Sequence, residues 1–347
     1  MKFLKISLVF VLSFLLLVGC GSNNTQNNNS NNTVAKEYEQ SKQEEILKEF
    51  DELKSKNNKD SKNNDTRKVV SLVKKNIPNM STKNADKMIL DLEKILLTNL
   101  AYSETNTLYD KAANIENALY EEAKAYSYDY NKLMANRNEL SNTEVKDYLN
   151  FVKDGGYIIY TPEGMIGYLI DYEALNEYST SVSNDMANYL KFKAMDSNTP
   201  ATIDAGLAIS YEELSNRIAL GENFLKDYDK NNKIQRKIAI EEYLYFESYI
   251  RGVNNTPPFD FNTGKIQPDL LASYKKDIER NSFAGNLIKE LLEVVEANDY
   301  KYVDPDVNYE FYEKILNKQR EVVEKFGEKF SINNDDINTY YAELYGQ

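Results

Sequence analysis

The sequence contains no histidine and no tryptophan, and Cys20 is its single cysteine. Without histidine, a Ser–His–Asp triad, a Cys–His pair and histidine-ligated zinc, copper or iron are all excluded. A single cysteine allows no disulfide bond within the chain. The glycines form no phosphate-binding loop either, because Gly155-Gly156 and Gly164-x-x-Gly167 lack the motif and the helix that follows it. We therefore assign no catalytic residue, no metal ligand and no cofactor.

Basic side chains are in the minority, since the 347 residues include 42 Lys and Arg against 55 Asp and Glu. Two of the lysines, Lys2 and Lys5, belong to the leader described next. Residues 20–347 thus hold 40 basic and 55 acidic side chains, a formal charge of −15. Affinity for nucleic acid comes mainly from cations that face phosphates. This charge argues against a nucleic-acid partner and against broad adhesion to anionic lipid.

The first 20 residues have the pattern of an export signal. Lys2 and Lys5 lead into an apolar run from Ile6 to Val18, which is too short to span a bilayer of ~30 Å as a stable helix. The run ends in Leu17-Val18-Gly19-Cys20, which resembles the lipobox of bacterial lipoproteins. In that family the cysteine receives a diacylglyceryl group and the signal is cleaved in front of it.

The resemblance implies that residues 1–19 are a cleaved signal peptide. It also implies that Cys20 holds the mature chain on the extracytoplasmic face of the cell membrane through its diacylglyceryl group. Two acyl chains give the durable anchoring that one chain does not. An ordinary signal peptide followed by an incidental cysteine is the alternative.

Polar segments divide the rest of the chain. Residues 20–33 have no apolar side chain after the cysteine and predict a disordered tether, which reaches about 20 Å as a flexible coil. Residues 34–65 predict a charged helix, from about Val34 to Lys54, and a polar linker. We place a helical domain with a β-hairpin at 66–205 and a region of helical hairpins at 206–347.

Helical periodicity dominates the body of the chain. One apolar face recurs at i, i+3, i+4 and i+7 through Ala85, Met88, Ile89, Leu92, Ile95, Leu96 and Leu100. A single long helix is predicted from about Glu104 to Asn136, and a break from Pro200 to Gly206. Two β-prone runs within about 157–170 flank a Pro-x-Gly turn and predict a small β-hairpin. The expected fold class is mainly α: a helical bundle or helical-repeat-like array with this one hairpin.

An internal repeat is predicted in the second half. The segment Phe224–Leu244 aligns without gaps on Tyr274–Val294, at an offset of 50 residues. The identical pairs are Lys226 and Lys276, Asp227 and Asp277, Asn231 and Asn281, and Ile238 and Ile288. In both copies one helix ends in a polar turn and a second helix begins, which resembles the general pattern of tetratricopeptide-like repeats. The period is longer than in that family, and its Trp, Gly and Ala positions are not matched. Chance similarity between two amphipathic helix pairs is the alternative.

Three short patterns come close to known sites. Ser71-x-x-Lys74 has the spacing of a Ser–Lys dyad, but it falls in an amphipathic helix among other lysines, which favours a surface position. Asp227-x-Asp229-x-Asn231 and Asp304-x-Asp306-x-Asn308 copy the opening of an EF-hand loop. Both lack its glycine at position 6 and its acid at position 12, so an acidic turn at a helix end explains them better.

The predicted hairpin gathers aromatic side chains around one carboxylate. These candidate ligand-binding residues are Tyr157, Tyr160, Tyr168, Asp171 and Tyr172. Aromatic rings beside a carboxylate suit the recognition of a sugar, a peptide or a protein. The alternative is that the same tyrosines pack on the neighbouring helices.

These observations favour a cell-surface lipoprotein that acts as a non-enzymatic binding or scaffolding module for a protein or cell-wall partner. One alternative is the solute-binding lipoprotein of an uptake system, a class that usually has two α/β lobes. Another is a cell-wall hydrolase that uses a pair of carboxylates, although 55 acidic residues single out no pair.

Overall fold

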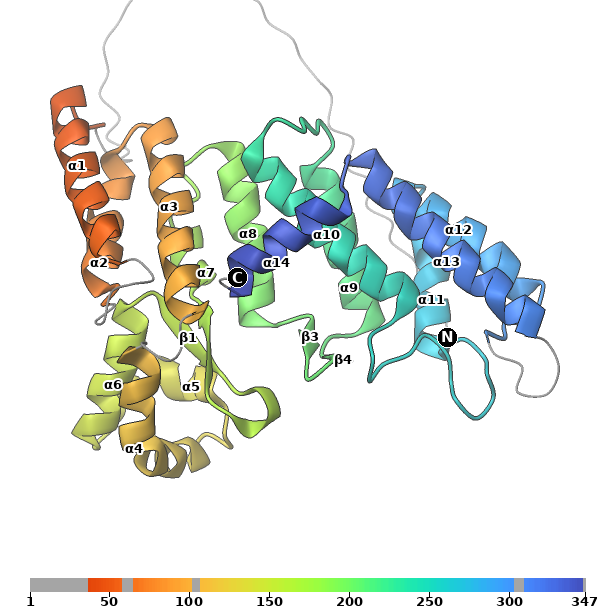
Figure 1. The fold of residues 1–347 in the computed structure, drawn as a ribbon. Coiled ribbons are helices and arrows are strands. Elements are labelled where there is room, and N and C mark those ends of the chain that lie inside the picture. The colour runs from red at the N-terminus through yellow and green to blue at the C-terminus, as the bar shows by residue number, and fades with distance from the viewer. Residues whose placement is uncertain (1–36, 58–64, 102–106, 303–308, 346–347) are drawn as a thin grey trace, which may run out of the picture. The chain divides into compact units, whose positions relative to one another are not determined.

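The computed structural model describes residues 37–57, 65–101, 107–302 and 309–345. Within these ranges the chain forms fourteen α-helices and two small antiparallel hairpins, which confirms the predicted fold class (Figure 1). The lipidation candidate Cys20, the tether at 20–33 and the acidic run at 304–308 lie outside the described residues.

The first half of the chain consists of helices that precede and surround the first hairpin. Its elements are α1 (Gln40–Lys56), α2 (Arg67–Asn76), the 3-10 turn η1 (Ile77–Asn79), α3 (Thr82–Ala101), α4 (Thr107–Lys124), α5 (Tyr130–Ala135), η3 (Arg137–Glu139), α6 (Thr143–Asp154), β1 (Tyr157–Tyr160), η4 (Pro162–Gly164), β2 (Gly167–Ile170) and α7 (Tyr172–Asn176). Helices α1, α2 and α3 contact one another, α3 contacts β2, and α5 and α6 contact β1. The hairpin is therefore held between helices.

The predicted hairpin has the register Tyr157 to Ile170 through Tyr160 to Gly167. The ring of Tyr160 packs directly over Gly167, since a Cβ atom at that position would lie 2.5 Å from the ring and would have to displace it. In β1 the buried side chains are Tyr157 and Ile159, which alternate along the strand. This alternation is expected of a strand with one face against the core.

One local prediction is wrong and another is incomplete. The long helix predicted from about Glu104 to Asn136 is interrupted between α4 and α5, where Ser127 and Tyr128 take positive φ angles of 56° and 60°. The side chain of Asp129 then caps α5 by accepting a hydrogen bond from the backbone N–H of Lys132. The break predicted from Pro200 to Gly206 is confirmed, because no helix crosses it. It contains a second hairpin that was not predicted, which turns through two residues with positive φ, Asp204 and Ala205.

The second half is an array of longer helices. Its elements are α8 (Asn184–Asn198), β3 (Thr202–Ile203), β4 (Gly206–Leu207), α9 (Tyr211–Phe224), α10 (Lys233–Arg251), α11 (Pro268–Glu279), α12 (Phe283–Glu296), α13 (Tyr309–Lys329) and α14 (Asn334–Tyr345). Helix α8 contacts α7, α9 and α10, so packing continues across residues 205 and 206. Helix α14 runs back over α10 and contacts α3 of the first half (Figure 1).

The repeat predicted at an offset of 50 residues is reproduced in part. Helices α10 and α12 begin exactly one offset apart, with Asn232 and Ser282 as their side-chain N-caps. The preceding helices end differently, since α9 ends at Phe224 and α11 continues to Glu279. The aligned residues Asp227 and Asp277 consequently lie in an exposed turn and in a buried helical position. The equivalence holds for the second helix of each pair.

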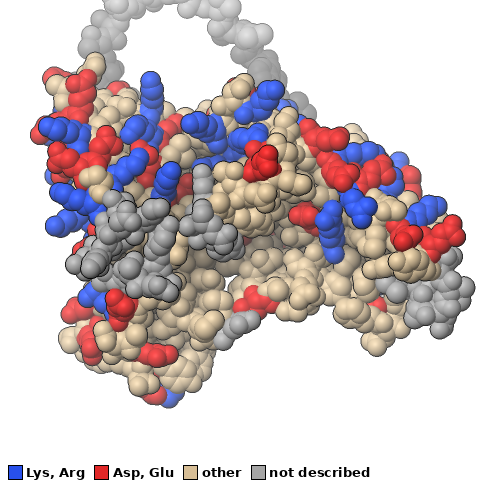
Figure 2. Space-filling view, in the orientation of Figure 1, with Lys and Arg blue, Asp and Glu red and all other residues tan. Residues whose placement is uncertain are grey.

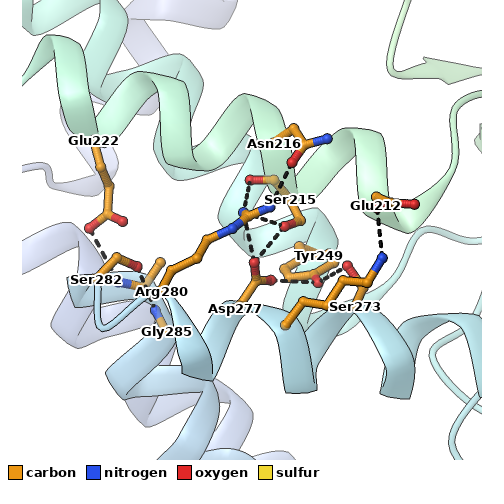
Figure 3. A network of polar contacts seen from close by, with 12 residues as sticks. Glu212, Ser215, Asn216, Glu222, Tyr249, Ser273, Asp277, Arg280, Ser282 and Gly285 are labelled. Atoms are coloured by element: carbon orange, nitrogen blue, oxygen red, sulfur yellow. Dashed lines mark hydrogen bonds and ion pairs between the residues drawn. The ribbon is translucent and has the colours of Figure 1, made fainter. Parts of the chain in front are cut away.

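Asp277 joins three helices of this array through a polar network (Figure 3). Its Oδ1 accepts a hydrogen bond from Ser215 of α9 and pairs with Arg280 at 2.8 Å. Its Oδ2 accepts a hydrogen bond from the hydroxyl of Tyr249 of α10 at 2.7 Å, and that hydroxyl is also 2.5 Å from Ser273 Oγ. Charge-assisted bonds of this kind are among the stronger polar contacts in proteins.

Replacing Asp277 with alanine is expected to lower the free energy of unfolding by roughly 3 kcal/mol, because it leaves Arg280 and Tyr249 without their buried partner. Asp227→Ala, at the aligned and exposed position, is the matched control and is expected to change it by less than about 0.5 kcal/mol. Urea unfolding followed by circular dichroism measures both. Equal losses in the two variants would contradict the role given to the network.

Candidate ligand-binding cavity

Elements far apart in the sequence line a cavity of about 630 Å³. One part of its lining comes from α3, α4 and the hairpin β1–β2, and another part comes from α8, α10 and α14. On the face seen in Figure 2, uncharged residues predominate over the hairpin and the β3–β4 turn, while lysines and arginines gather over α3 and the upper helices. Cavities of this size commonly enclose a small ligand.

The lining from α3, α4 and the hairpin is aromatic and aliphatic. Tyr109 and Tyr168 meet edge to face, with ring centroids 4.9 Å apart and an interplanar angle of 84°. The hydroxyl of Tyr168 bonds to the hydroxyl of Tyr148 at 2.5 Å, which fixes the ring. Tyr160 and Leu97 extend this surface. This part of the cavity therefore presents rigid rings whose faces and edges are apolar.

The lining from α8, α10 and α14 contains a buried ion pair. Lys193 Nζ of α8 lies 2.6 Å from Glu241 Oε1 of α10, and the two side chains are 11% and 6% exposed. Tyr340 of α14 donates a hydrogen bond to the same oxygen at 2.8 Å. The ammonium also lies 5.1 Å from the centre of the Tyr172 ring. Burial disfavours the ammonium form, but the charge of Glu241, together with Tyr172 and the charge of Glu93, outweighs it and raises the pKa of Lys193 well above its usual value.

A second buried acid, Glu93 of α3, lies near this ion pair, and its negative charge also favours the ammonium form of Lys193. The hydroxyl of Tyr172 donates a hydrogen bond to its Oε1 at 2.7 Å, and Tyr189 donates to the same oxygen. Lys237 Nζ lies 3.2 Å from its Oε2. Burial raises the pKa of Glu93, but the charges of Lys237 and Lys193 outweigh it, and the pKa ends below its usual value. Glu93 is thus held in its ionised form.

The remaining carboxylate of the cavity is also paired. Asp196 Oδ1 accepts hydrogen bonds from the hydroxyl of Tyr245 at 2.9 Å and from the backbone N–H of Ala201 at 3.0 Å. Arg217 Nη1 lies 3.4 Å from that oxygen, while its Nη2 donates to the carbonyl of Thr199 at 2.9 Å. Each carboxylate that lines the cavity therefore has a cation beside it.

The structure places the five predicted residues in two different roles. Tyr160, Tyr168 and Tyr172 line the cavity. Tyr157 is completely buried away from it, where its hydroxyl donates to the carbonyl of Leu96 and accepts from Asn99 of α3. Asp171 is 3% exposed and caps α7. Tyr157 and Asp171 thus hold the hairpin to its neighbours and do not face the cavity.

Sequence reasoning missed the charged residues of the cavity, Lys193, Asp196 and Glu241. A signal was present, since Lys193 directly follows Phe192 and Glu241 follows the apolar run Ile238-Ala239-Ile240. A charged side chain on an otherwise buried helix face needs a partner. The identity of that partner depends on how α8 packs on α10.

The described residues contain no group of three or more Cys, Asp or Glu placed to hold a metal ion. In the acidic run that begins at Asp227, the carboxylate of Asp229 accepts hydrogen bonds from the backbone and side-chain N–H groups of Asn231. This is a closed turn between α9 and α10.

A second unusual site lies on the other side of α10. Glu242 is completely buried, and neither of its carboxyl oxygens makes a hydrogen bond. Glu222 of α9 lies beside it and accepts from the backbone N–H of Ala284 and from Lys329 Nζ through Oε1, while its Oε2 is buried and unpaired. Burial, and then the charge of Glu222, raise the pKa of Glu242 well above its usual value. This favours the protonated, uncharged form of Glu242.

Comparison with protein-family models, with curated proteins and with solved structures finds no match to this chain. Its function is therefore inferred from the geometry of its own residues.

The raised pKa of Glu242 gives a defined dependence of stability on pH. The folded state keeps a proton that the unfolded chain releases above the usual glutamate pKa of about 4.3, so folding loses stability as the pH rises from there. Glu242→Gln imitates the uncharged acid. Above about pH 4.3, the free energy of unfolding of this variant should increase relative to that of the wild type by up to about 1.4 kcal/mol per pH unit.

Glu324→Gln, an exposed glutamate of α13, is the control for the loss of one carboxylate. Urea unfolding at several pH values between about 5 and 8 gives the free energy of unfolding of all three proteins. If the free energies of unfolding of the wild type and of Glu242→Gln differ by the same amount at every pH in this range, Glu242 is ionised in the folded protein and the prediction is wrong.

Proposed function

We propose that this protein is a cell-surface lipoprotein that acts as a non-enzymatic binding module and captures part of a protein or cell-wall partner in the cavity. The observation that carries the proposal is the composition of the cavity wall: rigid tyrosine rings and aliphatic side chains surround a few fixed polar groups. Ligand sites generally have this composition, with an apolar lining and a small number of placed polar groups.

The polar groups of the cavity are held in place by one another. Lys193 is paired with Glu241, and Asp196 with Arg217. Hydrolysis by two carboxylates needs a pair of acids that both act on the substrate, whereas here each carboxylate is engaged by a cation of the protein. The arrangement therefore supports recognition better than it supports hydrolysis by two carboxylates. The mainly α fold of the described residues likewise differs from the two α/β lobes usual for solute-binding lipoproteins.

The location at the cell surface is proposed from the leader alone. Leu17-Val18-Gly19-Cys20 supplies the resemblance to a lipobox, and Lys2 and Lys5 supply the basic start. Among the residues that the structure describes, no helix is both long enough and apolar enough to cross a bilayer. In this proposal the lipid on Cys20 attaches the protein to the membrane.

Replacing Cys20 with alanine is expected to abolish lipid attachment. Cells grown with an isotope-labelled fatty acid should incorporate the label into the wild-type protein and into the control Ser22→Ala, but not into Cys20→Ala. The reason is that the thiol is the acceptor of the diacylglyceryl group in the lipoproteins that the leader resembles. Mass spectrometry of the N-terminal peptide checks the position. Label found in Cys20→Ala would contradict the anchor.

Filling the cavity is expected to remove the captured ligand. Ser248 of α10 lines the cavity, whereas Ser71 of α2 is exposed elsewhere. Ser248→Phe should lower the amount of compound that copurifies with the protein from its own cells by about tenfold, and Ser71→Phe should leave it unchanged. Native mass spectrometry measures the bound compound, and circular dichroism verifies the fold. The same amount in both folded variants would place the ligand outside the cavity.

A further inference from the structure

The hydrogen-bonding groups that remain free in the cavity define what it can recognise. Ser197 Oγ donates to the carbonyl of Ala194 at 3.3 Å, and Ser248 Oγ donates to the carbonyl of Leu244 at 2.9 Å. A serine that has donated its proton to its own helix keeps only lone pairs for a ligand. These two residues thus offer acceptors to a bound molecule.

The ion pair offers both kinds of group at one place. Glu241 Oε1 accepts from Lys193 and Tyr340, and among the described residues no further hydrogen bond reaches this carboxylate, so its Oε2 is available. An ammonium group has three N–H donors, of which Glu241 takes one. A ligand group that both donates and accepts, such as a hydroxyl, matches this combination of a carboxylate oxygen and ammonium protons.

The charge balance of the cavity favours an uncharged ligand. Lys193 and Glu241 compensate each other, and Arg217 compensates Asp196. A ligand with a net charge would add an unpaired charge beside the Lys193–Glu241 pair, whose side chains are only 11% and 6% exposed. The desolvation of such a charge is costly unless a new partner is available. The described lining residues supply none.

The aromatic part of the lining sets the shape of the ligand. Tyr109, Tyr160 and Tyr168 offer ring surface, and Leu100 and Ile170 lie beside them. A pyranose ring has C–H groups that pack on aromatic surface and hydroxyl groups around its edge. An acyl chain would leave the acceptors of the polar lining unused, and a phosphate or a carboxylate would disturb the charge balance.

We propose that the cavity binds an uncharged saccharide, with its ring on the tyrosines of the hairpin and α4 and with its hydroxyl groups on Ser197, Ser248 and the Lys193–Glu241 pair. This inference rests on the proposed function, in which the cavity is the ligand site. Lys193 and Glu241 are here binding residues, and Tyr340 positions Glu241 from the C-terminal helix. A neutral sugar unit of a cell-wall polymer has the required chemistry.

The test uses the full chain in a detergent that has no sugar head group. Isothermal titration calorimetry compares four sugars with closely related rings: glucose and N-acetylglucosamine, which are neutral, glucosamine, which is a cation, and glucuronate, which is an anion. At least one neutral sugar is expected to bind, and the charged sugars should bind more weakly by about tenfold or more. Tyr160→Ala should weaken the neutral sugar, whereas Tyr120→Ala, at an exposed tyrosine of α4, should not.

The outcomes separate this proposal from the one on which it rests. Equal or tighter binding of glucosamine or glucuronate would overturn the preference for a neutral ligand and leave the cavity as a ligand site. If no sugar binds but a copurifying compound is still lost in Ser248→Phe, the saccharide proposal is wrong and the binding function stands. If neither sugar binding nor a Ser248-dependent compound is found, both proposals are wrong.

Discussion

The buried pair of Lys193 and Glu241 is the interaction on which the arrangement around the cavity depends. It joins α8 to α10, and Tyr340 attaches α14 to the same carboxylate. Removal of either charge would leave the other one buried without compensation, which costs far more than the net value of the intact pair. The ion pair therefore fixes how the three helices approach one another. The C-terminal helix is attached to α10 both through this carboxylate and through the ion pair of Arg236 with Asp336.

Tyrosine replaces the deeper aliphatic packing that a chain of this size would otherwise use. Several buried or half-buried tyrosines end on a carboxylate, among them Tyr172 and Tyr189 on Glu93, Tyr245 on Asp196, Tyr249 on Asp277 and Tyr340 on Glu241. Each buries an aromatic ring and at the same time supplies a hydrogen bond that an acid needs in the interior. This explains how a chain with a formal charge of −13 and 27 tyrosines can form a continuous core.

Local features of this fold could be predicted from the sequence, and features that depend on packing could not. The hairpin at 157–170 and the apolar helix face that runs from Ala85 to Leu96 follow from neighbouring residues. The turn at Ser127 and Tyr128 was missed because positive φ angles there fall on residues other than glycine. In the site, Tyr160, Tyr168 and Tyr172 could be predicted because they lie in the hairpin or directly after it. The pairing of Lys193 with Glu241, across 48 residues, required the packing of α8 on α10.

Glu241 and Glu242 show how far the environment decides the chemistry of identical side chains. They are neighbours on α10 and point about 100° apart around its axis. Glu241 meets Lys193 on the side of the cavity, whereas Glu242 meets Glu222 and is left without a hydrogen bond. The charged groups at the cavity are thus occupied in holding helices together. In the proposed complex the ligand contacts the groups that are not used in this way: serine lone pairs, ammonium protons of Lys193 and tyrosine rings. These groups suit the hydroxyl groups of a ligand better than they suit a charged group.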